Sequence, residues 1–559
     1  MEPDLVVSLQ RLFGHAGFRS VQREVIEHFL GGGSGLVLMA TGEGKSLCYQ
    51  LPAFVGDGIT LVVSPLIALM DDQVEALRQR GLPATCVHSM LDRGERERRL
   101  DRVRTGEVQL LYVTPERFRV DGFLDAVQAM PVRRFVIDEA HCVSHWGHDF
   151  RPDYLRLGDV RGALGRPPCL ALSATATPAV QQDIRAVLGL EDAPLFHTGI
   201  ARPNLFLSVH ACDDDGEKLR RLRTVLARTG GPCIVYCALI KDLLRLEGEL
   251  QRAGISPLVY HGNLSAHERS TQQRAFQSSD NALMLATNAF GMGVDKADIR
   301  AIVHWQIPRT LEACYQEVGR AGRDGLGSFC ELLYREEDLV IQRNFTEWAN
   351  PTAAFARQIV DHLQALGDRL HAVDLETLRA TFLVQNRHDG RVDTVLRLLR
   401  SGGCTRGELG RDLVVVRAPS DAELADWLPE DKRRADLMGL LRMVRYATEP
   451  VCRKQTMHAH FGFDDIAGAC GACDICTEAA TWMDQHLPPS RALPAQPVAT
   501  ASSAPLQRGD WIDVGGLGLC CVQSVHRRGS SWRAQVERAA DLSSHQLDLA
   551  RRRWRRVER

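Results

Sequence analysis

Residues 39–46 have the sequence MATGEGKS and follow the apolar run at residues 36–38. The two glycines allow a tight turn, so that successive backbone N–H groups and the start of a following helix point at phosphate groups. Lys45 adds a positive charge for the β- and γ-phosphates, and Ser46 offers a hydroxyl to magnesium. The usual pattern has one more glycine, where this chain has Met39. The segment predicts a phosphate-binding loop, although a glycine-rich turn without a ligand is the alternative.

A pair of acids follows another apolar run, at residues 135–137. A buried parallel strand that ends there presents both carboxylates at the carboxyl edge of its sheet. We expect Asp138 to hold magnesium through water and Glu139 to orient or deprotonate the attacking water. An isolated acid pair is normally a solvated strand end. Because this acid pair follows a phosphate loop along the chain, it favours a site that hydrolyses a nucleoside triphosphate.

Length and composition limit the number of domains and the class of protein. The chain has 559 residues, more than one core can hold, which predicts about three to five domains. It carries 68 basic and 70 acidic side chains, so a nucleic-acid surface would have to be local. No run of about twenty apolar residues occurs, and the N-terminus does not resemble a signal peptide. We therefore expect no membrane segment and a cytoplasmic protein, associated with the nucleoid if the organism is bacterial.

The pattern of elements predicts an α/β fold. Between about residues 20 and 335, short β-branched runs alternate with amphipathic stretches, which is typical of βαβ units with parallel sheets. A break near residues 200–215 predicts two doubly wound lobes, at residues 1–205 and 206–345.

Residues 316–325 have the sequence QEVGRAGRDG and belong to the predicted second lobe. Arg320 and Arg323 would share one face if a helix began here. An arginine that reaches a phosphate from a neighbouring lobe stabilises the transition state and links lobe closure to hydrolysis. The alternative is a solvated basic helix end, but the phosphate loop and the acid pair favour the first interpretation.

Together these segments resemble a known family. The sequences TGEGKSLCYQ (41–50), SPLIALM (64–70), DEAH (138–141), SATAT (173–177) and QEVGRAGR (316–323) look like the ordered helicase motifs of superfamily two. The sequence CVSHWGHDFRP at residues 142–152 narrows the resemblance to the RecQ family of ATP-dependent DNA helicases. The resemblance covers about residues 10–335 and implies two RecA-like lobes, ATP as the nucleotide and 3′ to 5′ movement.

The resemblance also assigns residues. It implies that Arg19 and Gln22 lie at the adenine, where the amide of Gln22 reads the base edge, and that Ser173 and Thr175 link the nucleotide state to lobe movement. The predicted ATP-binding residues are Arg19, Gln22, Thr41, Gly42, Glu43, Gly44, Lys45 and Ser46.

The segment after the acid pair is too polar for a core and too aromatic for a neutral surface. Its predicted DNA-coupling residues are His145, Trp146, His148, Phe150 and Arg151. Stacking of a base on an aromatic side chain contributes about 1–3 kcal/mol, so this loop could sense single-stranded DNA next to the catalytic acids. An aromatic turn packed under the lobe interface is the alternative.

Four of the 16 cysteines have the spacing of a metal site, and the others fit small core residues. Cys470, Cys473 and Cys476 follow one another at three-residue intervals, and Cys452 lies upstream. Four thiolates suit tetrahedral zinc, and a cytoplasmic location argues against disulfides. The spacing resembles the RecQ zinc module, which we expect at residues 421–485. Free thiols in a glycine-rich loop are the alternative.

Residues 346–420 depart from the family pattern. Two helical stretches and a β-rich run follow one another in the order of a winged helix, with Arg391, Arg397 and Arg400 available to phosphates. In typical RecQ proteins the winged helix follows the zinc module, whereas this candidate precedes it. DNA binding and a structural spacer both remain open.

The last part of the chain predicts a linker at residues 486–506, rich in Pro, Ala and Ser, and a small β-rich domain at residues 507–559. Residues 551–556 have the sequence RRRWRR, either an anchor for phosphates or a disordered solubilising tail.

The sequence thus favours an ATP-dependent 3′ to 5′ DNA helicase of RecQ type in DNA repair or recombination. The expected cofactors are ATP, Mg²⁺ and Zn²⁺, and the expected partner is single-stranded and duplex or forked DNA. One alternative is a nucleic-acid-stimulated ATPase that translocates or remodels nucleoprotein without separating strands. The other is a binding scaffold that has lost hydrolysis.

Overall fold

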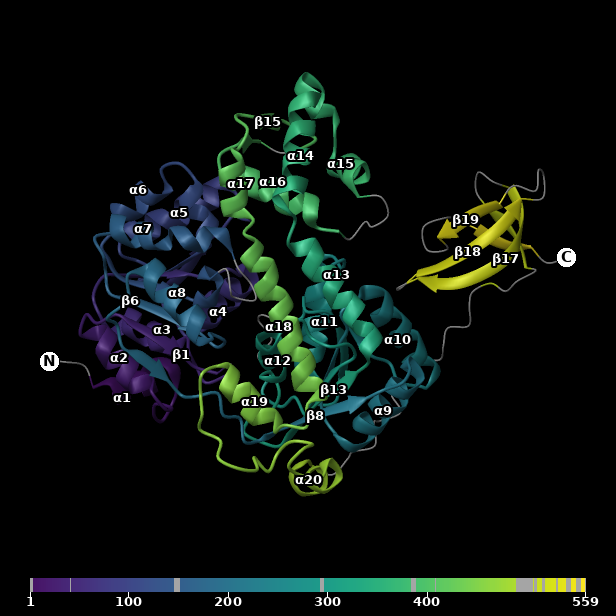
Figure 1. The fold of residues 1–559 in the computed structure, drawn as a ribbon, viewed down its shortest axis with the longest axis horizontal. Helices are drawn as coiled ribbons and strands as arrows, with labels where there is room; N and C mark the ends of the chain where they lie inside the picture. The colour runs from purple at the N-terminus through teal and green to yellow at the C-terminus, as the bar shows by residue number, and fades with distance from the viewer. Residues whose placement is uncertain are drawn as a thin grey trace. The chain divides into compact units, whose positions relative to one another are not determined.

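The computed structural model describes residues 4–559 except 41, 145–150, 292–295, 384–388, 408, 489–505, 507–509, 515–517, 529–530, 539–543, 549–553 and 558–559. The chain divides into two compact units (Figure 1). The larger comprises Met1–Glu249 and Pro257–Ala492, and the smaller comprises Leu250–Ser256 and Leu493–Arg559. None of the described helices combines the length and the hydropathy that a membrane crossing requires.

The first lobe contains a seven-stranded parallel sheet with strand order β3-β4-β2-β5-β6-β1-β7. Leu36 and Val37 are neighbours in β1, and they enter different hydrophobic cores because successive side chains point to opposite faces of a sheet. Both faces are therefore covered, which explains the unbroken apolar runs of the strands. Its strands are β1 (Gly35–Leu38), β2 (Ile59–Val63), β3 (Ala84–Val87), β4 (Leu110–Val113), β5 (Val132–Ile137), β6 (Cys169–Ser173) and β7 (Leu195–His197). Its helices are α1 (Leu5–Phe13), α2 (Gln22–Leu30), α3 (Leu47–Val55), α4 (Ile67–Gln79), α5 (Arg93–Arg104), α6 (Phe123–Gln128), α7 (Leu157–Ala163) and α8 (Pro178–Leu188).

The second lobe contains a six-stranded parallel sheet with strand order β10-β11-β9-β12-β13-β8. The predicted α/β class, with two doubly wound parallel-sheet lobes, is confirmed. The strands are β8 (Leu205–Ala211), β9 (Cys233–Tyr236), β10 (Leu258–Tyr260), β11 (Leu283–Ala286), β12 (Ala301–His304) and β13 (Ser328–Tyr334). The helices are α9 (Asp215–Arg228), α10 (Ile240–Arg252), α11 (Ala266–Ser278) and α12 (Leu311–Val318), followed by α13 (Leu339–Ala349).

A helical segment, α14 to α17, follows α13 and has a hydrophobic core of its own. The predicted order of two helices and a hairpin is present. The prediction that Arg391 is available to phosphates is wrong. Its guanidinium is paired with Asp389 at 2.6 Å and lies 4.8 Å from the ring centre of Phe355. The elements are α14 (Ala353–Leu366), α15 (Leu375–Phe382), α16 (Arg391–Ser401), β14 (Thr405–Arg406), β15 (Val414–Val415) and α17 (Asp421–Trp427).

The cysteine-containing module consists of α18 (Glu430–Thr448), α19 (Arg453–His460), the loop that follows and α20 (Ala479–His486). This module packs on the second lobe, since α18 contacts α12 and α13 (Figure 1). It also continues the edge of the second sheet: the N–H of Leu207 in β8 donates to the carbonyl of Ala472 at 3.2 Å.

The smaller unit contains a five-stranded antiparallel sheet with order β19-β18-β17-β16-β20. Residues 554–556 of the basic stretch lie in β20, which pairs with β16, so the alternative of a disordered tail is wrong for them. Residues 551–553 and most of the predicted linker lie outside the described residues. The strands are β16 (Trp511–Val514), β17 (Gly518–Arg528), β18 (Ser531–Arg538), β19 (Ser544–Asp548) and β20 (Trp554–Val557).

Candidate nucleotide and nucleic-acid sites

The predicted phosphate loop lies between the end of β1 and the start of α3. Gly42 and Gly44 have φ angles of 91° and 81°, a region that favours glycine. Met39, which replaces the usual first glycine, is buried, and the thiol of Cys48 lies 3.9 Å from its sulfur. That position therefore belongs to the core rather than to the phosphate-facing turn. Thr41 lies outside the described residues.

Gln22 is bonded to the loop. Its side chain is 2% exposed, and its amide nitrogen donates to the carbonyls of Glu43 at 2.9 Å and of Gly44 at 3.2 Å. Its amide oxygen accepts from the backbone N–H of Arg19 at 2.8 Å. Both N–H donors of the amide are thus used by backbone carbonyls, and a base that Gln22 recognises through these donors would have to replace the two bonds.

The acid pair lies at the carboxyl end of β5, as predicted. Burial, and next the charge of Glu139, raise the pKa of Asp138 from its ordinary value of 3.8 to about 7. The backbone N–H of Glu139 donates to Oδ1 of Asp138 at 3.0 Å, and the φ of Glu139 is 48°. A left-handed residue other than glycine, Asn or Asp is uncommon, and such conformations cluster at functional sites.

His141 connects the acid pair to β6. Its Nδ1 lies 3.3 Å from Oε2 of Glu139 and 3.1 Å from Oγ of Ser173. Oγ of Ser173 also accepts from the backbone N–H of Thr175 at 3.1 Å. The link between the acids and residues 173–175 therefore passes through His141, whose role the sequence does not indicate.

The two arginines after α12 occupy different places. Arg320 is buried, and its guanidinium donates to the carbonyl of Gly291 within the second lobe. Arg323 reaches the phosphate loop, since a β-carbon added to Gly42 would lie 3.0 Å from its Cγ and Cδ. Their predicted common helical face is wrong, because α12 ends at Val318 and both arginines lie in the turn that follows.

A contact that the sequence did not indicate joins the loop to the connection between the lobes. The hydroxyl of Thr198, just after β7, donates to the carboxylate of Glu43. The ring of His197 lies 5.3 Å from that of Phe463 in the cysteine-containing module. The phosphate loop, the interlobe connection and the module therefore form one line of contacts.

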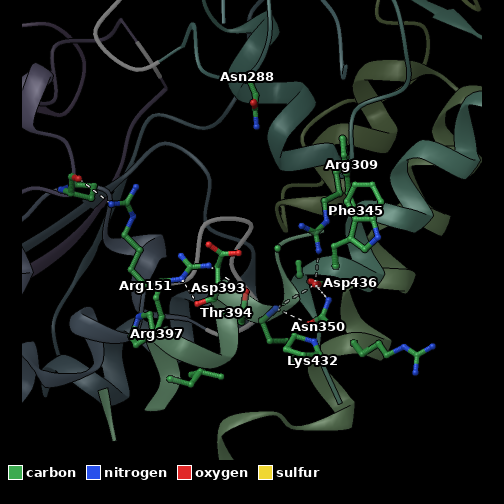
Figure 2. Close-up of a pocket in the computed structure, with 18 of the residues that line it drawn as sticks. Arg151, Asn288, Arg309, Phe345, Asn350, Asp393, Thr394, Arg397, Lys432 and Asp436 are labelled. Carbon is green, nitrogen blue, oxygen red and sulfur yellow. Dashed lines mark hydrogen bonds and ion pairs between the residues drawn. The ribbon is translucent and has the colours of Figure 1, made fainter. Parts of the chain in front are cut away.

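Of the predicted DNA-coupling residues, His145, Trp146, His148 and Phe150 lie outside the described residues. Arg151 is described, and its guanidinium donates to the carbonyl of Pro65 at 3.0 Å. It lines a cavity of about 1910 Å³ between the two lobes and the helical segment (Figure 2). In the view of Figure 2, Arg309 and Phe345 lie to the right, and Arg151 and Arg397 lie to the left.

The four predicted zinc ligands come together, with the sulfurs of Cys452, Cys470, Cys473 and Cys476 within 4.8 Å of one another. A hydrogen bond from the Cys470 thiol lowers the pKa of Cys473 to about 4. A thiolate is the form that binds metal, and four sulfur donors at this separation fit tetrahedral zinc.

A second group with ligand atoms within 4.8 Å consists of Asp71, Cys86 and His88. The guanidinium of Arg99 lies 3.2 Å from the sulfur of Cys86, and its positive charge opposes a metal cation there.

Comparisons with known protein families identify the chain as a helicase. The DEAD/DEAH box helicase family matches residues 19–184, and the helicase conserved C-terminal domain matches residues 217–325. The RecQ zinc-binding family matches residues 419–477, which include all four clustered cysteines. The chain therefore has the two helicase lobes and the zinc module in the order that the resemblance implied.

The chain belongs to the RecQ family of DNA helicases. It is 41% identical to the probable ATP-dependent DNA helicase RecS of Bacillus subtilis (strain 168), over 65% of this chain and 73% of that protein. It is 38% identical to the ATP-dependent DNA helicase RecQ of Haemophilus influenzae (strain ATCC 51907 / DSM 11121 / KW20 / Rd), over 66% of this chain and 59% of that protein. The DNA-bound crystal structure of the DUF1998 helicase MrfA has a similar fold, with a TM-score of 0.51, 16% identity and coverage of 76% of this chain and 64% of that one.

Proposed function

We propose that this protein is an ATP-dependent DNA helicase that hydrolyses ATP between its lobes and moves 3′ to 5′ along single-stranded DNA. The main support is the contact of Arg323 from the second lobe with the phosphate loop at Gly42. Nucleotide held by the loop then meets a positive charge from the other lobe only when the lobes are closed. This geometry couples hydrolysis to lobe movement.

Each residue of the site has a role in this proposal. Backbone N–H groups of the loop and Lys45 bind the phosphates, and Glu139 accepts a proton from the attacking water. Arg323 stabilises the charge of the transition state, whereas Arg320 holds the turn in place through Gly291. Bound magnesium, held by Ser46 and Asp138, would neutralise charge on the phosphate oxygens.

DNA acts on this site through the segment that follows the acid pair. His145, Trp146, His148, Phe150 and Arg151 would contact single-stranded DNA, and the segment joins Glu139 through η2 (Ala140–Val143). His141 would pass a displacement of this segment to Ser173. Zinc would fix the module against β8 and would take no part in hydrolysis.

The relatives support DNA as the substrate, since RecS is named as a probable DNA helicase and RecQ as a DNA helicase. We further propose a role in DNA repair or recombination in the cytoplasm. The proposed division of the chain is two lobes (1–205 and 206–345), a winged-helix-like segment (346–420), the zinc module (421–485), a linker (486–506) and a β-rich domain (507–559).

Strand displacement tests this function and its polarity. Duplexes with a 3′ or a 5′ single-stranded overhang are incubated with the protein, ATP and magnesium, with Lys45→Ala as the control. We expect displacement only of the 3′ overhang substrate and only by the unsubstituted protein. Hydrolysis of ATP without displacement of either duplex would favour the alternative, an ATPase that translocates or remodels nucleoprotein.

A further inference from the structure

One face of α16 forms a wall of the interlobe cavity. Asp393, Thr394, Arg397, Leu398, Arg400 and Ser401 all line it, and they recur with the spacing of a single helical face. Arg406 of β14 lines the same cavity. The helical segment therefore turns a charged face inward, toward the lobes.

The basic groups of this wall are not neutralised. Arg397, Arg400 and Arg406 are exposed, and none of them forms an ion pair with another described residue. Toward the described part of the chain, Arg397 makes hydrogen bonds only within its own helix, to Thr394 at 3.2 Å and to the carbonyl of Asp393 at 3.4 Å. Its guanidinium therefore retains donors for a ligand.

Most acids of the cavity lining are already paired. Asp393 binds Arg379 at 2.8 Å, and Asp436 binds Arg309 at 2.6 Å. Among the described residues, Glu116 and Glu430 are exposed lining acids without an ion pair. The three arginines of the wall therefore give this side of the cavity a positive charge, which suits a polyanion.

An aromatic pair lines the same cavity. Phe345 and Trp348 of α13 are half-buried, with ring centres 5.6 Å apart and an interplanar angle of 62°. Aromatic side chains beside a basic groove are typical of proteins that bind single-stranded nucleic acid, because bases stack on the rings while arginines follow the backbone.

The helical segment also reaches the first lobe. Arg119, at the end of η1 (Pro115–Arg119), donates to the hydroxyl of Ser401 at 3.0 Å, and α14 follows closely after α13 of the second lobe. The cavity is thus bounded by both lobes and by α16. Its volume of about 1910 Å³ exceeds that of ordinary small-molecule pockets, about 300–1,000 Å³, and fits a stretch of polymer.

We propose that α16 and β14 form a second binding wall for single-stranded DNA, which holds the strand in this cavity while the lobes move. Arg397, Arg400 and Arg406 bind phosphates, and Phe345 with Trp348 stacks bases. The segment thus acts as a clamp on one strand rather than as a reader of the duplex major groove. This inference rests on the proposed function, because it assumes that DNA is the substrate.

The double variant Arg397→Ala/Arg400→Ala tests the wall. Arg434→Ala/Arg442→Ala in α18 is the matched control, because both of its arginines are exposed, outside the cavity lining and without an ion pair in the described part of the chain. Binding of labelled oligo(dT) is measured by fluorescence anisotropy over a series of salt concentrations. We expect the first variant to bind about tenfold more weakly.

The salt dependence gives the sharper result. Two lost phosphate contacts should make the slope of log K against log salt less negative by about 1.4, at about 0.7 for each contact on a single strand. The control should keep the slope of the unsubstituted protein. Equal slopes in the two double variants would overturn the proposal.

Measurements of DNA-stimulated ATP hydrolysis distinguish a failure of this proposal from a failure of the proposed function. In the Arg397→Ala/Arg400→Ala variant, kcat at saturating DNA should be unchanged, and the DNA concentration for half-maximal stimulation should rise. If DNA fails to stimulate the unsubstituted protein, the proposed function is wrong. If stimulation is normal and both double variants match the unsubstituted protein, only the wall is wrong.

Trp348→Leu tests the aromatic part independently. Stacking is not ionic, so this variant should bind oligo(dT) more weakly with an unchanged salt slope. Unchanged affinity would remove Phe345 and Trp348 from the proposal.

Discussion

Arg323 of the second lobe packs against Gly42 of the phosphate loop so closely that a β-carbon at position 42 would lie 3.0 Å from its Cγ and Cδ. The second arginine of the same turn, Arg320, is directed to the carbonyl of Gly291 instead. One turn thus supplies one arginine to the nucleotide site and one to its own lobe.

Substitution of these arginines should therefore have different effects. Arg323→Ala should lower kcat for ATP hydrolysis by about 10³ with little change in the unfolding temperature, because arginine fingers stabilise the transition state by about this factor or more. Arg320→Ala should lower the unfolding temperature, because it leaves the carbonyl of Gly291 without this donor. Steady-state hydrolysis and thermal unfolding of both variants measure the difference. Equal loss of stability in both variants would contradict the assignment.

The raised pKa of Asp138 predicts a pH dependence of stability. Its pKa rises from 3.8 to about 7 on folding, mainly through burial, so in this window the folded state holds a proton that the unfolded state releases. The contribution of Asp138 to the free energy of unfolding is complete below its unfolded pKa of 3.8 and is lost as the pH rises through its folded pKa of about 7. Asp138→Asn should therefore unfold at a higher temperature than the unsubstituted protein at about pH 8, by about 1 °C for each kcal/mol recovered in a chain of this size, and should differ little at about pH 4.

Thermal unfolding without nucleotide or magnesium, at both pH values, checks this prediction. An Asp138→Asn protein that tracks the unsubstituted protein across the range would show that Asp138 is ionised in the folded state throughout.

Gln22 should affect both nucleotide choice and loop stability. Gln22→Ala removes the bonds to the carbonyls of Glu43 and Gly44 together with the proposed contact to adenine. The KM for ATP should rise about tenfold, and the preference for ATP over GTP should disappear. Gln10→Ala, an exposed position in α1, is the control. Selectivity that survives in Gln22→Ala would assign base recognition to other residues.

The cysteine cluster predicts a structural metal. Cys473→Ser should lose bound zinc, from about one ion for each chain to almost none, and should unfold at a lower temperature. Cys521→Ser, a cysteine outside the cluster, should keep both properties. Metal analysis and thermal unfolding with and without a chelator are the measurements. Normal zinc content in Cys473→Ser would refute the four-thiolate site.

Much of the fold and the nucleotide site could be predicted from sequence because the residues that carry the chemistry follow the ends of strands. Gly42, Gly44, Asp138 and Glu139 each follow a short apolar run, and a parallel sheet brings such ends to one edge. The four zinc-binding cysteines could be predicted equally well, because a structural zinc site requires four donors, often at short sequence spacing.

What the sequence could not provide was long-range pairing. The spacing of Arg320 and Arg323 suggests one helical face, but α12 ends before them and each finds a different partner. Local charge likewise could not show that Asp389 neutralises Arg391 or that β20 pairs with β16, since these interactions depend on tertiary contacts.

The decisive measurement is ATP hydrolysis by the purified chain, with magnesium, in the presence and absence of single-stranded DNA. We predict hydrolysis that DNA stimulates, and a Lys45→Ala protein that binds DNA but does not hydrolyse ATP. Absence of hydrolysis with DNA and magnesium both supplied, or equal rates for the two proteins, would show that the phosphate loop and the acid pair do not form an ATP-hydrolysing site.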